Sequence, residues 1–249
     1  MNSNETSTNK IVRQFFRFIS DDKQLAINDF YAKCLERNYI EYKNKEDVFM
    51  NININHTEDN LDVLKNWSGY NFKNINNVLR DRWTYEENGN ISQKEKYNEI
   101  AYEIEQTIKN NASSIGNVKV FRGVSLEYFK DYGINSLDGI FKLKDQFLID
   151  TGLVSTSLVE DKCFYKKENE LGRNYNIKIE YLIPEEFEDG IFIGNLSYSK
   201  DQCEYLINTW NLAKVIDVIT TENDAVIKAL FIPKQVYDNY YTYSNRSTK

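Results

Sequence analysis

Three short segments of the chain carry residue types that could do chemistry together. Phe121-Arg122-Gly123 ends a predicted strand, where the guanidinium could bind two phosphate oxygens and the glycine would let a ligand approach the backbone. Ser155-Thr156-Ser157 follows an apolar pair, and strand alternation would point both serine hydroxyls to one face, where they could hold a carboxylate. In Gln202-Cys203-Glu204 the same alternation predicts the amide and the carboxylate on one face, about 7 Å apart. Each segment alone is also typical of a structural strand end, so the hypothesis of a site depends on their combination.

The scarce residue types exclude several classes of enzyme. His56 is the only histidine and the sequence has no Gly-x-Ser-x-Gly motif, which argues against a Ser-His-Asp hydrolase. A single histidine also excludes a histidine-based zinc site. Cys34, Cys163 and Cys203 lie far apart without a Cys-x-x-Cys pair, so we interpret them as buried small residues and expect no metal cofactor.

Charge and hydropathy restrict the partners. The chain has 249 residues with 31 basic and 38 acidic side chains, a formal charge of −7, and its Lys and Arg form no cluster, so nucleic acid is not the expected partner. No apolar run is long enough for a membrane span. Residues 11–19 are interrupted by Arg13 and Arg17 and predict an amphipathic helix in place of a signal peptide. We therefore expect no membrane segment, and a protein that stays inside its cell or has lost a leader.

The elements that must position the three segments fall into two parts. The first 112 residues have helical periodicity, and 92–111 is the clearest helix, with a capping box formed by Ser92 and Glu95. After about residue 117, runs of branched and aromatic residues predict strands. These runs are 118–121, 153–154, 177–181, 191–193, 205–207, 215–218 and 226–231. Helices followed by strands predict an α+β fold and argue against a doubly wound α/β fold.

The combination of the three segments resembles the mono-ADP-ribosyltransferases of the Arg–Ser–Glu class. An aromatic-Arg-Gly segment comes first, Ser155 follows Arg122 by 33 residues, and Glu204 follows Ser155 by 49. The residue types, their order and their placement at strand ends all agree with that class. The resemblance runs from about Trp67 to Val218.

A narrower resemblance is to the Rho-modifying exoenzymes of clostridial type. Ile75-Asn76 followed by Leu79-Arg80 is similar to the helical segment of that family whose Asn and Arg contact NAD. Phe164 lies seven residues past Ser157, where the family places an aromatic residue on nicotinamide. The stretch 152–158, Gly-Leu-Val-Ser-Thr-Ser-Leu, reads much like the strand of the family.

The resemblance implies an α+β fold in which N-terminal helices pack on a mixed, mainly antiparallel β core of two sheets. It implies one catalytic domain over residues 10–237, with a helical part, 10–112, and a β-rich core, 113–237. Residues 238–249 have no periodicity, and we expect them to form a loose tail.

The resemblance also implies NAD as co-substrate, cleaved at the ribose–nicotinamide bond. Its transition state is oxocarbenium-like, so a carboxylate near the ribose would stabilise the developing positive charge. Glu204, held by Ser155, is the expected carboxylate. Arg122 and Arg80 would bind the pyrophosphate, and Asn76 would add a hydrogen bond. Fixing remote parts of NAD in this way would orient the bond that breaks.

The resemblance also implies that Gln202 determines which acceptor the enzyme modifies. In this class a Glu at that position accompanies arginine targets, whereas the Gln amide could pair with the carboxamide of an Asn or with a guanine edge. Tyr198 would contact the target protein, although it lies one residue further from the Gln than is usual. Phe164 would cover the nicotinamide. The stretch 166–175 is longer and more charged than in the family, which leaves open whether Arg173 or Lys167 adds a basic contact.

The sequence is consistent with several alternatives. The preferred reading is a toxin-type transferase, secreted or delivered into a target cell, that modifies an Asn of a Rho-family GTPase. The same site could act on a nucleobase or another protein, or mainly hydrolyse NAD. The chain could also be a catalytically weak toxin subunit or interaction module, and its helical part could bind a carrier or translocation partner. Phe164 could be a core aromatic residue, and Asn76 and Arg80 could be surface residues of an Asn-rich helix.

Overall fold

The computed structural model describes residues 19–52, 62–84, 89–166, 174–197 and 200–237. Among the described residues before 112, regular structure is helical, as predicted, apart from isolated bridges at Ile40 and Tyr42. The described α-helices are α2 (Asp21–Leu35), α3 (Lys45–Asn51), α4 (Asp62–Asn66), α5 (Phe72–Leu79), α7 (Ile91–Asn111) and, after the last strand, α8 (Lys234–Tyr237), and the π-helical turn η2 (Trp67–Asn71) joins α4 to α5. Short 3₁₀ helices lie between the strands: η3 (Leu126–Tyr132), η4 (Asp138–Leu143), η5 (Glu160–Lys162), η6 (Gly194–Leu196) and η7 (Lys200–Gln202). The helix expected over 11–19 falls almost wholly outside the described residues, and so does the tail 238–249.

The clearest predicted helix is confirmed, but its cap is different. The Asn90 side chain accepts the backbone N–H of Gln93 at 3.1 Å, and the Gln93 side chain accepts the backbone N–H of Asn90 at 3.0 Å. This pair forms the capping box of α7, so the prediction of Ser92 and Glu95 was wrong. Asn90 caps as well as a serine does and precedes Ser92 on the chain, while the Ser92 hydroxyl donates to Asn90 Oδ1 at 2.7 Å.

The strands form one mixed sheet in the order β2-β7-β8-β4-β1-β3-β6-β5. Their bounds are β1 (Val118–Val124), β2 (Phe147–Asp150), β3 (Val154–Ser157), β4 (Ile177–Ile183), β5 (Gly190–Phe192), β6 (Glu204–Ile207), β7 (Asn211–Thr220) and β8 (Ala225–Ile232). Pairings among these strands are antiparallel except that of β4 with β8. The expectation of a mainly antiparallel α+β core is confirmed.

The expectation of two separate sheets was wrong. β1 pairs with β4 along its whole length and also with β3 at Phe121 and Ser157, and this contact joins the two halves into one eight-stranded sheet. β2 was not predicted, because its four residues form a short edge strand that ends in the charged Asp150.

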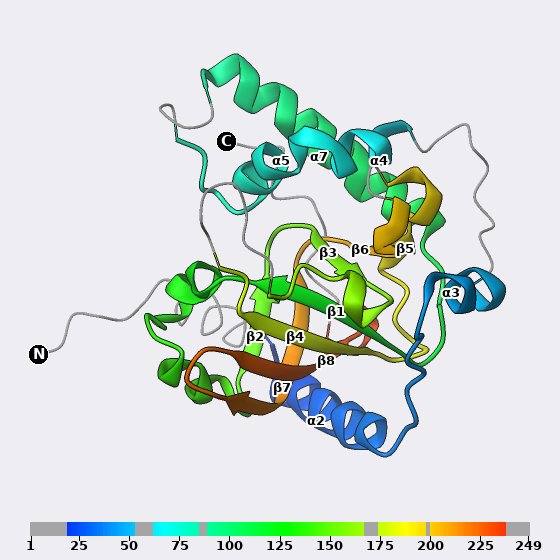
Figure 1. Ribbon diagram of the computed structural model, residues 1–249, viewed down its shortest axis with the longest axis vertical. Helices are drawn as coiled ribbons and strands as arrows, with labels where there is room; N and C mark the ends of the chain where they lie inside the picture. The colour runs from blue at the N-terminus through cyan, green and yellow to red at the C-terminus, as the bar shows by residue number, and fades with distance from the viewer. Residues whose placement is uncertain (1–18, 53–61, 85–88, 167–173, 198–199, 238–249) are drawn as a thin grey trace, which may run out of the picture.

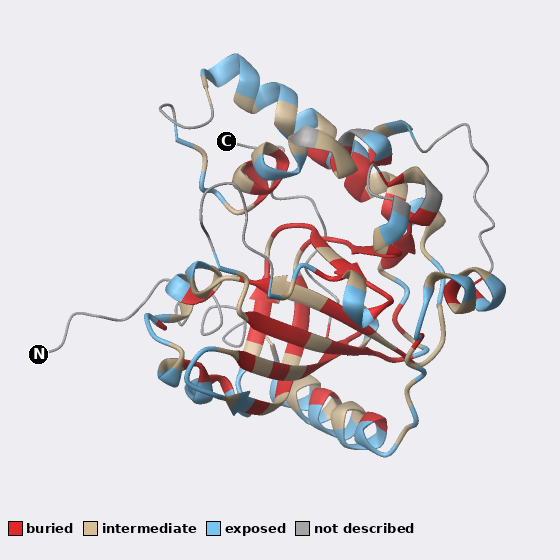
Figure 2. Cartoon of the chain, in the orientation of Figure 1, coloured by how far each residue is buried: buried red, intermediate tan, exposed pale blue. Residues whose placement is uncertain are grey.

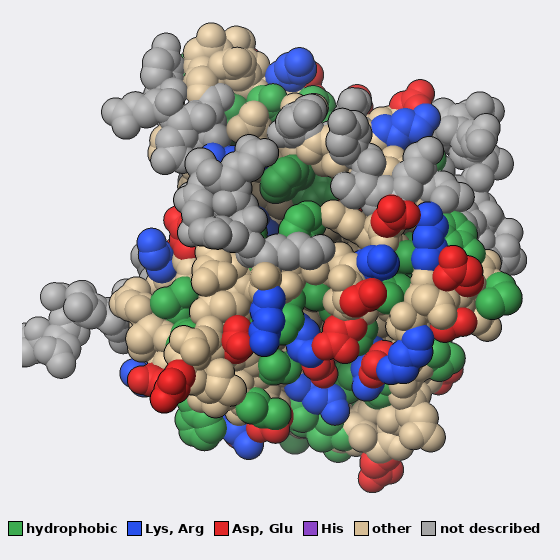
Figure 3. Space-filling model, in the orientation of Figure 1, with side chains coloured by type: hydrophobic (Ala, Val, Ile, Leu, Met, Phe, Trp, Pro, Cys, Tyr) green, Lys and Arg blue, Asp and Glu red, His purple; other side chains and the backbone are tan. Residues whose placement is uncertain are grey.

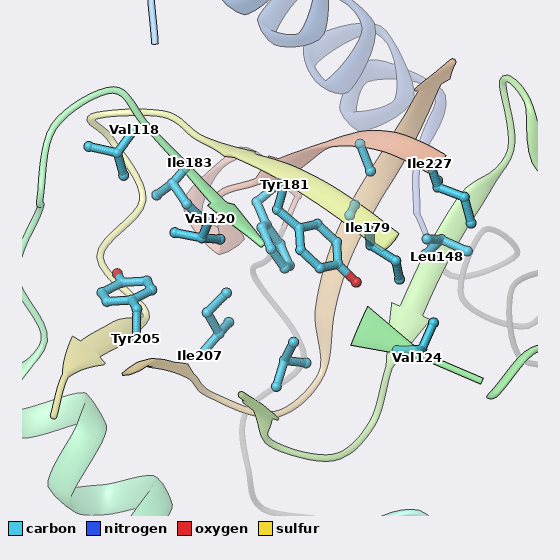
Figure 4. Packing of buried hydrophobic residues seen from close by; sticks show 14 of the residues in the cluster. Val118, Val120, Val124, Leu148, Ile179, Tyr181, Ile183, Tyr205, Ile207 and Ile227 are labelled. Carbon is cyan, nitrogen blue, oxygen red and sulfur yellow. The ribbon is translucent and has the colours of Figure 1, made fainter. Parts of the chain in front are cut away.

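Three apolar clusters hold the helices on the sheet. On one side α2 packs on β2, β7 and β8, and on another α4, α5 and α7 pack on β3, β5 and β6 (Figure 1). The largest cluster lies along the inner face of the sheet, where Val120, Ile179, Tyr181, Tyr205 and Ile207 point toward one another (Figure 4). Buried residues accordingly concentrate in the strands and on the sheet-facing sides of the helices (Figure 2). All three clusters thus include residues of the strands.

The cysteines and the membrane prediction can be checked in the same structure. Cys34, Cys163 and Cys203 are buried, as expected. In the part of the chain that the structure describes, no helix is both long and apolar enough to cross a membrane.

Candidate active site

Glu204 begins β6 and lies in a polar pocket of three neutral donors. The Ser155 hydroxyl donates to its Oε1 at 2.6 Å, and the indole N–H of Trp67 donates to the same oxygen at 3.2 Å. The Ser197 hydroxyl donates to Oε2 at 2.9 Å. β3 and β6 pair in antiparallel fashion, and this register sets Ser155 opposite Leu206, so that Ser155 and Glu204 are on the same face of the sheet. The structure therefore brings Ser155 and Glu204 together.

Burial dominates the electrostatics of Glu204. The side chain is only 4% exposed, and burial raises its pKa above the ordinary value, although the hydrogen bonds from Ser155, Ser197 and Trp67 lower it in part. These three donors are all uncharged. An ionised Glu204 would therefore have no cationic partner among them and would interact strongly with a positive charge placed next to it.

Gln202 does not lie on the strand with Glu204. It ends the short 3₁₀ turn η7 (Lys200–Gln202), and Cys203 between the two adopts a left-handed backbone with φ of 47°. The expectation that spacing alone puts both side chains on one face was wrong, because that alternation requires an extended residue between them. The Ser157 hydroxyl donates to the Gln202 carbonyl at 2.6 Å, so Ser157 holds this turn and not the carboxylate.

The two arginines meet at a carboxylate that the sequence analysis missed. Arg80 donates to Asp150 from Nε and from Nη2, both at 3.0 Å, and Arg122 donates from Nη1 at 3.2 Å. Arg80 ends α5, Arg122 is on β1 and Asp150 ends β2, so three elements converge here. A signal did exist in the sequence, since Asp150 is an acidic residue that directly follows an apolar run and precedes Ser155 by five positions.

Asp150 is buried, yet its carboxyl group is strongly acidic. Burial raises its pKa, but the charges of Arg80 and Arg122, together with hydrogen bonds from Arg80 and the Gly152 N–H, lower the pKa to about 2. The ring of Tyr128 lies under Arg122, with 4.9 Å between the guanidinium carbon and the ring centroid. Such a stacked, ion-paired guanidinium is held in one orientation. One carboxylate thus holds both guanidinium groups.

Asn76 and Gly152 bring α5 into close contact with the segment that follows Asp150. The Asn76 amide accepts the N–H of Leu153 at 2.9 Å and donates to its carbonyl at 3.3 Å. A Cβ on Gly152 would lie 2.5 Å from Asn76 Oδ1 and 2.8 Å from Arg80 Nε, so only glycine allows this close approach. The alternative that Asn76 and Arg80 are surface residues was wrong, because Asn76 is buried and Arg80 is largely so.

Phe164 lies beside β1, and Gly123 makes room for it. A Cβ on Gly123 would be 2.4 Å from the Tyr165 nitrogen, so the backbone of Phe164 and Tyr165 occupies the space that we expected a ligand to use. Phe164 itself is 48% exposed and 6.2 Å from the ring of Tyr175, which excludes the alternative of a core aromatic residue. Tyr198, Lys167 and Arg173 lie outside the described residues.

The face of the molecule seen in Figure 3 is hollowed. Figure 3 shows hydrophobic side chains in a recess that lies between α5 and α7 on one side and β3 on the other. Among the described residues no group of three or more His, Cys, Asp or Glu side chains is arranged to hold a metal ion. The chemical features on which we base a function are therefore the buried carboxylate of Glu204 and the two arginines paired with Asp150.

Comparison with known families gives one match that spans most of the chain. A family model described as "ADP-ribosyltransferase exoenzyme" matches residues 35–236. A comparison with curated proteins found no match.

Solved structures of similar fold include several exoenzymes. The C3 exoenzyme of Clostridium limosum has a TM-score of 0.61 at 16% identity, over 79% of this chain and 98% of its own. A C3 exoenzyme from S. aureus, solved with NAD, has a TM-score of 0.61 at 17% identity, over 80% of this chain and 100% of its own. An ADP-ribosyltransferase from Clostridium botulinum has a TM-score of 0.59 at 19% identity, over 78% of this chain and 99% of its own. At these identities the likeness establishes the fold.

Proposed function

This chain belongs to the ADP-ribosyltransferase exoenzyme family, whose co-substrate is NAD, and we propose that it transfers ADP-ribose to an asparagine side chain of a Rho-family GTPase. One observation carries the chemistry: Glu204 is buried, hydrogen-bonded to Ser155 and surrounded by uncharged donors. A carboxylate in such surroundings can stabilise a cation that develops beside it.

In the proposed reaction the bond between ribose C1′ and the nicotinamide nitrogen breaks. The bonding electron pair leaves with nicotinamide, and the ribose becomes oxocarbenium-like. The Glu204 carboxylate, placed next to the ribose, stabilises this positive charge. The Ser155 hydroxyl holds Glu204 Oε1 in place. The acceptor nitrogen then bonds to C1′ and releases one proton, so the products are nicotinamide, the modified side chain and H⁺.

The remainder of NAD would be held at the arginine pair. Arg80 and Arg122 would bind the diphosphate, and Phe164, half-exposed beside β1, would cover the nicotinamide ring. The segment from Asp150 to Ser155 connects the two ends of the site, since it contacts both arginines at one end and Glu204 at the other. Fully extended, it spans at most about 17 Å, which suits a dinucleotide lying along it.

The acceptor is assigned from Gln202. Its side chain sits on a turn outside the strand, and an amide there can hydrogen-bond a carboxamide but cannot take up a proton as a second Glu would. We propose that this amide selects an Asn acceptor. By analogy with the toxins of similar fold, we also propose that the protein is delivered into a target cell.

The test is to incubate the chain with labelled NAD, a panel of small GTPases and a duplex DNA, and to locate the label by mass spectrometry. We expect label on an Asn of a Rho-family GTPase and none with the variant Glu204→Gln. Label on DNA, or on another side chain, would overturn the acceptor, and free ADP-ribose alone would indicate a hydrolase.

Substitution of Gln202 tests acceptor selection by itself. Gln202→Ala should lose transfer but keep NAD hydrolysis, because Ser157 holds the turn through the backbone carbonyl of residue 202. Gln146→Ala, on an exposed glutamine, is the matched control. Equal loss of both activities would show that Gln202 does not select the acceptor.

A further inference from the structure

Asp150 joins two arginines that come from separate parts of the chain. Arg80 is 70 residues away in sequence and Arg122 is 28 away, yet both guanidiniums donate to the same carboxylate. Two guanidinium groups side by side repel each other, and a shared carboxylate removes much of that repulsion. Without Asp150 nothing in this set of contacts would bring the two groups together.

The Asp150 carboxylate is itself firmly held. Tyr128 donates its hydroxyl to Oδ2 at 2.8 Å, and the backbone N–H of Gly152 donates to Oδ1 at 2.9 Å. The residue is 8% exposed and its backbone pairs with Asn211 of β7. With donors from two arginines, a tyrosine and the backbone, the carboxylate is in a fixed position from which it can orient other groups.

The arginines keep hydrogen-bonding capacity for a ligand. Arg80 uses its Nε–Nη2 edge on Asp150, so its Nη1–H groups point away from the carboxylate. Arg122 reaches Asp150 through Nη1. The charges sum to +1, two guanidiniums less one carboxylate, which is complementary to an anionic diphosphate.

We propose that Asp150 is the positioning residue for the diphosphate of NAD: it holds Arg80 and Arg122 side by side before NAD binds. This inference rests on the proposed function, in which these two arginines bind that diphosphate. A purely structural ion pair would stabilise the fold without favouring any particular ligand.

The two effects of Asp150 on anion binding have opposite signs, which makes the inference testable. Asp150→Asn raises the charge of the site by one, so electrostatic attraction alone predicts tighter binding of a diphosphate. The variant also places an NH₂ group against groups that donate, which releases at least one arginine from its position. We expect positioning to dominate, because displacement of binding groups by about 1 Å can cost as much as 100-fold.

The experiment is calorimetric titration of the full chain with ADP-ribose and, separately, with nicotinamide. For Asp150→Asn we expect affinity for ADP-ribose to fall by about 10- to 100-fold while affinity for nicotinamide is unchanged. KM for NAD should rise in parallel, with kcat within about threefold of the unsubstituted chain. Equal or tighter ADP-ribose binding by the variant would overturn the inference. Asp217→Asn, on a half-exposed aspartate paired with Lys144, is the matched control.

Two further sets of variants keep the outcomes distinct. If Arg80→Gln and Arg122→Gln leave ADP-ribose affinity unchanged, the proposed diphosphate site itself is wrong. If they weaken it and Asp150→Asn does not, only the inference about Asp150 fails. Should Asp150→Asn not fold, Tyr128→Phe decides, since it removes one donor to Asp150 and keeps the ring under Arg122. We expect it to weaken ADP-ribose binding by about 2- to 10-fold, and unchanged binding would contradict the inference.

Discussion

Two buried carboxylates lie at the two ends of the segment 150–155 and have opposite surroundings. Asp150 begins the segment, and Glu204 accepts a hydrogen bond from Ser155 at its other end. Glu204 receives hydrogen bonds from two hydroxyls and an indole, and burial raises its pKa. Asp150 is buried to a similar degree but contacts two guanidiniums, and its pKa is about 2. The same penalty of burial therefore leads to different results, because only one of the two groups has cationic partners.

Under the proposed function, this difference gives the two carboxylates separate roles. An ionised carboxylate without a cationic partner is suited to meet a positive charge that appears only during the reaction. A carboxylate that already binds two arginines cannot do this, but it fixes them for an anion that is present from the start. Substitutions at the Glu204 end should therefore change kcat, and those at the Asp150 end should change binding.

The largest effect is expected for Glu204→Gln. The amide keeps the size of the side chain but cannot stabilise a cation, so the rate of NAD cleavage should fall by about 1,000-fold or more. Binding of ADP-ribose should stay within about threefold, because the arginine pair is untouched. Single-turnover release of nicotinamide and calorimetry with ADP-ribose measure the two quantities.

Glu222→Gln, on an exposed glutamate of the β7–β8 turn, provides the matched control for that substitution. Retention of most of the cleavage rate by Glu204→Gln would remove the basis of the comparison. A large loss of ADP-ribose binding would instead show that the two ends do not act separately.

Gly152→Ala tests the link between the ends. The added Cβ would lie 2.5 Å from Asn76 Oδ1 and 2.8 Å from Arg80 Nε, so α5 must shift away from Asp150. We expect the free energy of unfolding to fall by about 1–3 kcal/mol and ADP-ribose affinity by about tenfold. Chemical denaturation and calorimetry measure both. Gly69→Ala is the control, since a Cβ there meets no atom within 4 Å; wild-type affinity in Gly152→Ala would mean that Arg80 does not depend on this contact.

The structure brings Ser155 and Glu204 together as the sequence predicted, because the signal of these residues, like that of Arg122, is local. Each follows or begins a short run of branched residues, and alternation along a strand predicts which face such a side chain takes. The predicted side-chain face was wrong for Gln202, because Cys203 has a left-handed backbone that turns the chain. A cysteine at that position does not predict a left-handed backbone. The predicted division into two sheets was also wrong, because the single contact between Phe121 and Ser157 has no sequence signature.

The residues that sequence reasoning missed act through distant contacts. Trp67 is 137 residues from Glu204, and Asp150 is 70 from Arg80. Such contacts depend on how α5, η2 and the strands pack, and one sequence without its relatives contains no pattern that pairs them. Ser197 is nearer, seven residues before Glu204, but nothing distinguishes it from the other polar residues of its loop.

The two carboxylates should also differ in their effect on the pH dependence of cleavage. Glu204 must be ionised to act, and its pKa is raised by burial, so activity should be lost as pH falls through a value above the ordinary glutamate pKa of 4.5. Asp150 stays ionised until about pH 2 and should add no step in this range. The hydrogen bond from Ser197 lowers the pKa of Glu204, so Ser197→Ala should move the acid limb of kcat/KM to higher pH. This is measured by profiles of kcat/KM between about pH 4 and 9 for the unsubstituted chain and for Ser197→Ala. An acid limb that moves to lower pH in Ser197→Ala would contradict the assignment of this limb to Glu204.

The smallest effect is expected for Trp67→Phe, which removes one donor from Glu204 and keeps most of the buried ring. Loss of a single neutral hydrogen bond of 3.2 Å should lower kcat by about 2- to 10-fold. It should also raise the pKa of Glu204, because the indole N–H favours the ionised carboxylate. Trp83→Phe is the matched control, since that indole donates to the backbone carbonyl of Gly89 at 3.3 Å. A change in KM without a change in kcat would place Trp67 with the binding end of the site, and the separation of roles between Glu204 and Asp150 would then not hold at this residue.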